Sequence, residues 1–207
     1  MSTASAINRS VVTAKPELAS AFGRLAPITG SWNPLVRFAA FLYRMATGGV
    51  ASPIEIIFAR APRLLPAHLI LMATSEYGLT LDRRLRALVR VFGSRVNECM
   101  FCDDLETKVA VDAGAIERED VDAMSDYLHS SRFSVRERAA LSYVEDLNTT
   151  RRASDEAFEN LRAHFSEKEI VEITWLNAVG NYLNLQAKPL GLSPEGECRL
   201  PNSQPAA

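Results

Sequence analysis

Cys99 and Cys102 form a CxxC pair that is followed directly by acidic residues. Two sulfurs at this spacing can form a disulfide after a small rotamer change. At the start of a helix, unpaired N–H groups and the helix dipole favour the thiolate form. This is the chemistry of peroxide reduction or thiol–disulfide exchange. We therefore interpret both cysteines as candidate catalytic residues. Two alternatives remain, half of a zinc site and a pair of buried, inert thiols.

A zinc site is poorly supported by the rest of the chain. Structural zinc requires four ligands, usually a second CxxC or a spaced histidine pair. Cys198, the third cysteine, lies in a Gly/Pro-rich tail and is interpreted as an incidental thiol. His68, His129 and His164 are scattered singly, and we interpret them as surface or capping residues. The sequence thus predicts no bound metal, whereas inert buried thiols stay an open alternative.

Composition excludes several classes of function. The 207 residues are 47% hydrophobic with a formal net charge of −2, enough for a core but without a basic surface. No basic run interleaved with aromatics indicates a nucleic-acid partner. No uncharged apolar stretch is long enough to cross a membrane, and the N-terminus lacks a continuous signal core. Three cysteines do not form a secreted disulfide framework. We therefore expect a cytoplasmic protein with no nucleic-acid or membrane partner.

Helical signals dominate the chain after its first residues. Hydrophobic residues recur at three/four spacing from Leu35 to Ala46, and serines that cap helices are followed by such stretches elsewhere. No strand alternation is evident, so the predicted fold class is all-α. We predict a flexible N-terminal arm over 1–32, one helical domain over 33–192 and a disordered tail over 193–207.

The predicted last helix, from Glu167 to about Ala187, is apolar nearly all round. Such a helix is normally buried in a bundle or at a subunit interface, so we expect a homo-oligomer, a trimer or hexamer. Asn177, Asn181 and Asn184 form a polar line along this helix. They could be buried amides bonded to neighbouring helices or a ligand site.

The run from Val96 to Asp103 and the later stretch from His164 to Glu172 resemble the alkylhydroperoxidase D (AhpD)-like and carboxymuconolactone decarboxylase superfamily. The resemblance spans roughly 54–192 and implies an all-helical bundle that assembles into trimers or larger rings. In the peroxidase branch the second cysteine attacks the hydroperoxide and the first resolves it. Cys102 would then be the attacker and Cys99 the resolver. The implied substrate is a small hydroperoxide or a protein disulfide, with an unidentified thiol reductant and no cofactor.

Two positions depart from the peroxidase branch. Glu106 stands where that branch has a proton-relaying histidine, and Ala87 stands where it has a glutamate. Glu106 lies one helical turn after Cys102, so a buried Glu106 carboxylate could accept the thiol proton instead. Alternatively Asp103, Asp104 and Glu106 serve mainly as charges that complement the helix dipole, with Asp104 paired to Lys108.

The function predicted from these residues is that of a thiol-dependent oxidoreductase, a peroxidase with a weakened proton relay, carried by Cys102, Cys99 and Glu106. One alternative is a cofactor-free decarboxylase of the family's other branch, which needs acid–base groups and no CxxC. Another is a non-enzymatic helical oligomer that keeps the scaffold.

Overall fold

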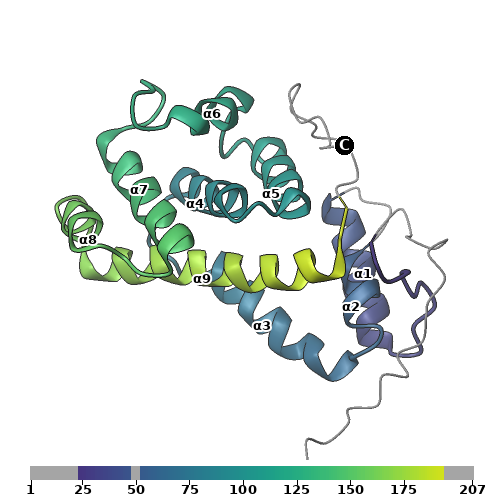
Figure 1. Cartoon of the computed structure of the whole chain (residues 1–207). Coiled ribbons are helices and arrows are strands. Elements are labelled where there is room, and N and C mark those ends of the chain that lie inside the picture. Colours follow the sequence, from purple (N-terminus) through teal and green to yellow (C-terminus); the bar gives the residue numbers. More distant parts are fainter. Residues whose placement is uncertain (1–22, 48–51, 194–207) are drawn as a thin grey trace, which may run out of the picture.

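The computed structural model describes residues 23–47 and 52–193, and within these ranges it contains helices and no strand. The all-α prediction is therefore confirmed. Figure 1 shows the arrangement of the elements. The helices are α1 (Pro34–Thr47), α2 (Pro53–Ile57), α3 (Leu65–Glu76), α4 (Arg83–Val96), α5 (Met100–Asp112), α6 (Arg118–Ala123), α7 (Val135–Thr150), α8 (Asp155–Arg162) and α9 (Glu167–Leu190), with 3-10 turns η2 (Pro62–Leu64) and η3 (Met124–Asp126).

Helix α9 runs along the whole bundle. Its beginning lies beside α7 and α8, and its end reaches α1 and α2, with α3 crossing beneath it (Figure 1). Helix α4 lies in the middle and packs against α5, α7 and α9. The main core gathers around α4, and a smaller core joins α1, α2 and the start of α3. The site described below lies where these two parts meet.

Several helix starts follow from short sequence signals. Ser134 and Ser166 each form a capping box, in which the serine and a glutamate three residues later satisfy each other's backbone N–H groups. The side chains of Ser52 and Asp82 accept hydrogen bonds at the starts of α2 and α4. These caps are local in sequence, so they could be predicted without knowledge of the fold.

Helix α9 differs from its prediction in two ways. It continues past Ala187 to Leu190 and includes Pro189, which has no N–H group to donate to the carbonyl one turn earlier. Gly191 then ends the helix in a left-handed conformation (φ 62°). Its outer face is not buried, since Val171 and Leu185 are each 67% exposed. The inner face packs into the core as expected.

The asparagine line on α9 consists of amides bonded to neighbouring helices, with Asn177 and Asn184 buried and Asn181 partly buried, which supports the first of the two interpretations. Asn177 and Asn148 of α7 exchange hydrogen bonds at 2.9 and 3.1 Å, and Asn181 donates to Asn148 at 2.8 Å. Gly93 of α4 permits this close approach, because a Cβ atom there would lie 3.1 Å from Oδ1 of Asn177. The amides therefore fix how α4, α7 and α9 sit together.

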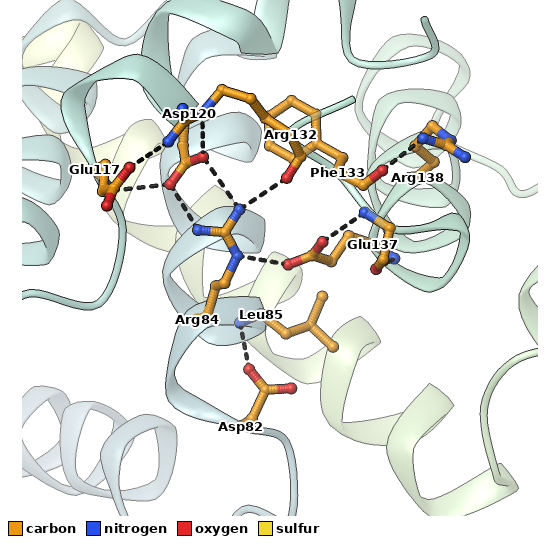
Figure 2. Close-up of polar contacts among 10 residues, drawn as sticks. Asp82, Arg84, Leu85, Glu117, Asp120, Arg132, Phe133, Glu137 and Arg138 are labelled. Carbon is orange, nitrogen blue, oxygen red and sulfur yellow. Dashed lines mark hydrogen bonds and ion pairs between the residues drawn. The ribbon is translucent and has the colours of Figure 1, made fainter. Parts of the chain in front are cut away.

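A network of ion pairs fastens α4 to the segment around α6. Figure 2 shows Asp120 between the guanidinium groups of Arg84 and Arg132, at 2.6 and 2.7 Å. Arg84 also reaches Glu137 at 2.7 Å. Burial alone would raise the pKa of Asp120, but hydrogen bonds from Arg84, from the Glu117 N–H and from Arg132 outweigh it and lower the pKa to about 2. The carboxylate is thus held ionised.

We expect Asp120→Asn to destabilise the protein by about 2–3 kcal/mol at pH 7, because two arginines lose a buried partner. A lowered carboxyl pKa stabilises the fold fully above the unfolded pKa of about 3.9 and is lost as the pH falls toward 2. Urea unfolding at pH 7 and at pH 3 should therefore show a smaller difference between variant and wild type at pH 3. Asp122→Asn, on the exposed face of the same helix, is the control. An equal difference at both pH values would contradict the assignment.

The segment before α1 lies against the end of α9. The N–H of Arg24 donates to the carbonyl of Leu190 at 2.8 Å, and that of Ile28 donates to the carbonyl of Glu55 at 3.2 Å. The rest of the predicted arm, 1–22, and the predicted tail with Cys198 lie outside the described residues. Among the described helices, none combines the length and the apolarity that a membrane crossing requires.

Candidate active site

The CxxC pair lies at the turn between α4 and α5. Asn97 caps the end of α4, Glu98 takes a left-handed conformation (φ 54°), and Cys99 precedes the first residue of α5. The N–H of Cys99 donates to the carbonyl of Ser94 at 3.0 Å. Cys102 then falls in the first turn of α5, as the sequence predicts.

Helix α9 holds this turn in place. The side chain of Asn97 donates to Oδ1 of Asn184 at 2.8 Å, and Asn184 in turn donates to Ser94 Oγ at 3.4 Å. The ammonium group of Lys188 donates to the carbonyl of Asn97 at 2.7 Å. The line of α9 amides therefore extends to the residues just before the cysteines and sets their position.

Cys99 and Cys102 are joined by a disulfide, with Cα atoms 5.2 Å apart. The disulfide inferred from the spacing is thus present, whereas its reversibility stays a prediction. Both residues are buried, at 3% and 6% exposed, and they pack against Ala187 and the partly buried Phe101 and Leu192.

A largely apolar cavity of about 670 Å³ opens beside Cys102, and we call it the thiol cavity. Its walls come from α1, α2, α3, α5 and α9, with Phe38, Phe58 and Phe101 among the aromatic side chains. Cys102 belongs to the wall, whereas Cys99 is not among the described residues that line it. Cys102 therefore borders the cavity, whereas Cys99 is packed among Cys102, Ala187 and their neighbours.

Glu106 and His68 bring polar groups to the thiol cavity. Burial raises the pKa of Glu106, the nearby Arg90 opposes this rise and Glu76 adds to it. Glu106 thus stands one turn from Cys102 as predicted, in surroundings that bring its carboxyl closer to a useful base.

The neighbouring acidic residues do not share this position. Asp103 pairs with Arg95 at 3.2 Å and also binds the Thr107 hydroxyl. Burial raises the pKa of Asp103, and Arg95 opposes the rise. Lys108 pairs with Asp112 at 3.1 Å, and its predicted pairing with Asp104 stays a prediction. Among the described residues, no three His, Cys, Asp or Glu side chains gather in a way that could hold a metal ion.

Comparisons of the sequence and the fold with known proteins identify the family of this chain. No protein-family model matches the chain. The uncharacterized protein YnjA of Escherichia coli K12 is 30% identical over 173 residues, which cover 82% of this chain and 93% of YnjA. A solved structure from Agrobacterium tumefaciens, of unknown function but bearing the name AhpD, is 29% identical, with a TM-score of 0.62 over 66% of this chain and 94% of that one. This chain belongs to the AhpD-like superfamily.

More distant structures share the AhpD-like fold. The debrominase Bmp8 superposes with a TM-score of 0.74 at 21% identity, over 83% of this chain and 92% of Bmp8. The AhpD core of a peroxidase-related protein from Ralstonia eutropha superposes with a TM-score of 0.66 at 20% identity, over 85% of this chain and 94% of that one. At such identities the likeness concerns the fold alone.

His68 corrects the interpretation of the histidines in this AhpD-like protein. His129 and His164 are exposed as expected, but His68 is only 9% exposed and lines the thiol cavity. Its ring stacks on Phe58 at 4.6 Å, and Nδ1 lies 3.4 Å from the hydroxyl of Tyr182. Burial lowers the pKa of His68 and so favours the neutral ring. No motif surrounds this residue in the sequence, because α2, α3 and α9 meet there only in the folded chain.

Proposed function

We propose that this protein is a thiol-dependent hydroperoxide reductase acting on apolar hydroperoxides. The observation that carries the proposal is the position of Cys102 in the wall of the thiol cavity, with Cys99 packed against Cys102. A nucleophile must face its substrate, and a resolving cysteine must reach the nucleophile once the substrate oxygen has been transferred. The apolar lining favours a substrate with an alkyl or aryl group over hydrogen peroxide.

The chemical steps balance with these groups alone. Glu106 accepts the proton of the Cys102 thiol, and the thiolate attacks the terminal oxygen of the hydroperoxide. The S–O bond forms as the O–O bond breaks, and the alkoxide takes the proton from Glu106 to leave as an alcohol. Cys99 then attacks the sulfenic acid, so the disulfide forms and water leaves. A dithiol reductant is required to restore both thiols.

The test starts from fully reduced protein from which the reductant has been removed. We expect cumene hydroperoxide to remove two hydrogens from the peptide that contains Cys99 and Cys102, and to do so faster than hydrogen peroxide at equal concentration. Peptide mapping by mass spectrometry measures both rates, and Cys198→Ser should behave as the wild type. Two free thiols remaining after treatment would refute the proposal.

A second candidate is reductive dehalogenation, which the fold likeness to the debrominase Bmp8 and the aromatic walls of the thiol cavity favour. Two thiols can reduce a carbon–bromine bond to carbon–hydrogen, with bromide and a proton released and the disulfide formed. The reduced protein is therefore also incubated with 2,3,4-tribromopyrrole, the compound bound in a Bmp8 structure. Bromide release with disulfide formation, without peroxide consumption, would favour this alternative.

We also infer assembly into a trimer or hexamer through the outer face of α9. Val171 and Leu185 are exposed there, and Trp175 lines a groove of about 670 Å³ with Phe158 of α8. We expect light scattering after gel filtration to give a multiple of the 22.8 kDa chain mass. Val171→Glu should reduce the measured mass of the assembly. Val135→Glu, at an exposed valine of α7, is the matched control. A monomer at micromolar concentration would contradict the assembly.

A further inference from the structure

Glu106 lies in the wall of a second cavity as well as in that of the thiol cavity. This second cavity, of about 250 Å³, is bounded by residues of α3, α4 and α5 and the loop after α5, and we call it the Ala87 cavity. Among the described residues, Glu106 is the one that belongs to both linings. Glu106 therefore borders both the apolar space beside Cys102 and a space that has charged side chains in its walls.

The small side chain of Ala87 contributes to this space. Ala87 is a buried residue of α4, at the position where the family resemblance leads one to expect a glutamate. The cavity has room for several water molecules, since each occupies about 30 Å³ in the liquid. Charged side chains of α3 and α4 in its walls can form hydrogen bonds with such waters. Arg86 lines it, and the Nε of Arg86 is buried with no hydrogen-bond partner among the described residues.

An ion pair in the wall of the Ala87 cavity acts on Glu106. Arg90 of α4 binds the carboxylate of Glu76 at 2.5 Å and the carbonyl of Ser75 at 2.6 Å, which fixes its guanidinium group. The two charges oppose each other at Glu106, because Arg90 favours its ionised form and Glu76 its neutral form.

The other charged and titratable groups near Glu106 line the same two cavities, and none of them takes part in the Glu76–Arg90 ion pair. In the Ala87 cavity, Arg83 donates to the carbonyl of Ala113, and Arg86 donates to the backbone carbonyl of Glu76 at 2.8 Å. In the thiol cavity, the titratable groups are His68 and Tyr77 at α3, Tyr43 from α1 and Cys102 from the same helix as Glu106.

We propose that the Ala87 cavity and the Glu76–Arg90 ion pair replace the missing proton relay, by hydrating Glu106 and setting its charge so that it can exchange a proton with Cys102. Glu76, Arg90 and Ala87 are then positioning residues that act through Glu106. The inference rests on the proposed function for its use in turnover, but it concerns the ionisation of the thiol, which can be measured without a peroxide.

The proton has a balanced course in this scheme. The Cys102 thiol loses its proton to the Glu106 carboxylate, and the carboxylic acid exchanges that proton with water in the Ala87 cavity. During turnover the same carboxyl group returns a proton to the alkoxide. The apolar walls of the thiol cavity need not admit bulk water for either transfer.

The test measures how fast iodoacetamide alkylates Cys102 as a function of pH. The probe protein is the reduced Cys99→Ser, Cys198→Ser chain, so that Cys102 is the sole thiol. A proton exchanged between Cys102 and Glu106 couples their titrations, so the proposal predicts a profile with two steps, of which the lower follows Glu106. Glu106→Gln in this background should remove the lower step.

The variants of the ion pair should move the lower step in opposite directions. Arg90→Gln removes the charge that favours ionised Glu106, so the midpoint rises by on the order of one pH unit, whereas Glu76→Gln lowers it. Arg90→Lys keeps the charge and should keep the midpoint close to the wild-type value. Ala87→Leu fills the cavity and raises the midpoint, whereas Ala87→Ser leaves it in place.

Arg83→Gln is the matched control, since it removes a cation of the same cavity that binds a backbone carbonyl instead of Glu76. A shift equal to that of Arg90→Gln would show a general effect of charge and overturn the inference. It would also be overturned if Glu106→Gln kept the lower step, if the two ion-pair variants shifted it in the same direction, or if Cys102 could not be alkylated at pH 9. If the protein reduces hydroperoxides but the variants of Glu106, Arg90 and Glu76 leave the alkylation profile unchanged, this inference is refuted and the proposed function is not.

Discussion

Cys102→Ser is expected to lower the consumption of cumene hydroperoxide by at least about a thousandfold, to the rate in buffer, because an unactivated hydroxyl does not replace a thiolate as nucleophile. Cys102 is the cysteine that borders the thiol cavity, so Cys99 cannot take its place. Stopped-flow measurement of hydroperoxide loss with the reduced protein gives the rate.

Cys99→Ser separates the two roles. Its Cys102 can still attack once, so we expect a single event per chain that leaves a sulfenic acid, seen as the gain of one oxygen in the peptide mass. Turnover with dithiothreitol should fall, since the disulfide between Cys99 and Cys102 can no longer form and the reductant must attack the buried sulfenic acid directly. An active Cys102→Ser variant would refute the thiol mechanism, and a normal turnover of Cys99→Ser would remove Cys99 from it.

The parts of the fold that could be predicted from sequence depend on neighbouring residues. The capping boxes at Ser134 and Ser166 and the Pro53 start of α2 each involve contacts within a few positions. The segment from Arg118 to Asp126, in contrast, divides into α6 and the 3-10 turn η3. Element boundaries are set partly by tertiary contacts, which a local pattern does not contain.

The residues of the candidate site also differ in whether they could be predicted from the sequence. Helical spacing places Glu106 one turn from Cys102, so the proximity of Glu106 to the thiol could be deduced. His68 could not, because it reaches the thiol cavity from α3 through the packing of α3 against α9. The Ala87 cavity could not be predicted from the sequence either. The sequence shows that a relay residue is changed to alanine, but only the packed helices show a cavity with charged side chains beside it.

The protein with Ala87→Glu and Glu106→His should reduce hydroperoxides about a hundredfold faster than the wild type. Both positions line the Ala87 cavity, which has room for the longer side chain at 87. A histidine titrates near neutral pH, so it is a better base for a thiol than a carboxyl group, even one such as Glu106 whose pKa is raised by burial and by Glu76. General acid–base help is typically worth about a hundred to ten thousandfold, and Glu106 already supplies part of it.

Each replacement alone should gain much less than the pair, because the two groups would relay one proton as a unit. The matched control is Ala87→Gln with Glu106→His, in which the amide fills the same space without accepting a proton. Stopped-flow rates with cumene hydroperoxide at pH 7 decide the outcome. If the wild type were as fast as the double variant, the Glu76–Arg90 pair would already give Glu106 the full strength of a histidine relay, and the weakened-relay prediction would be wrong.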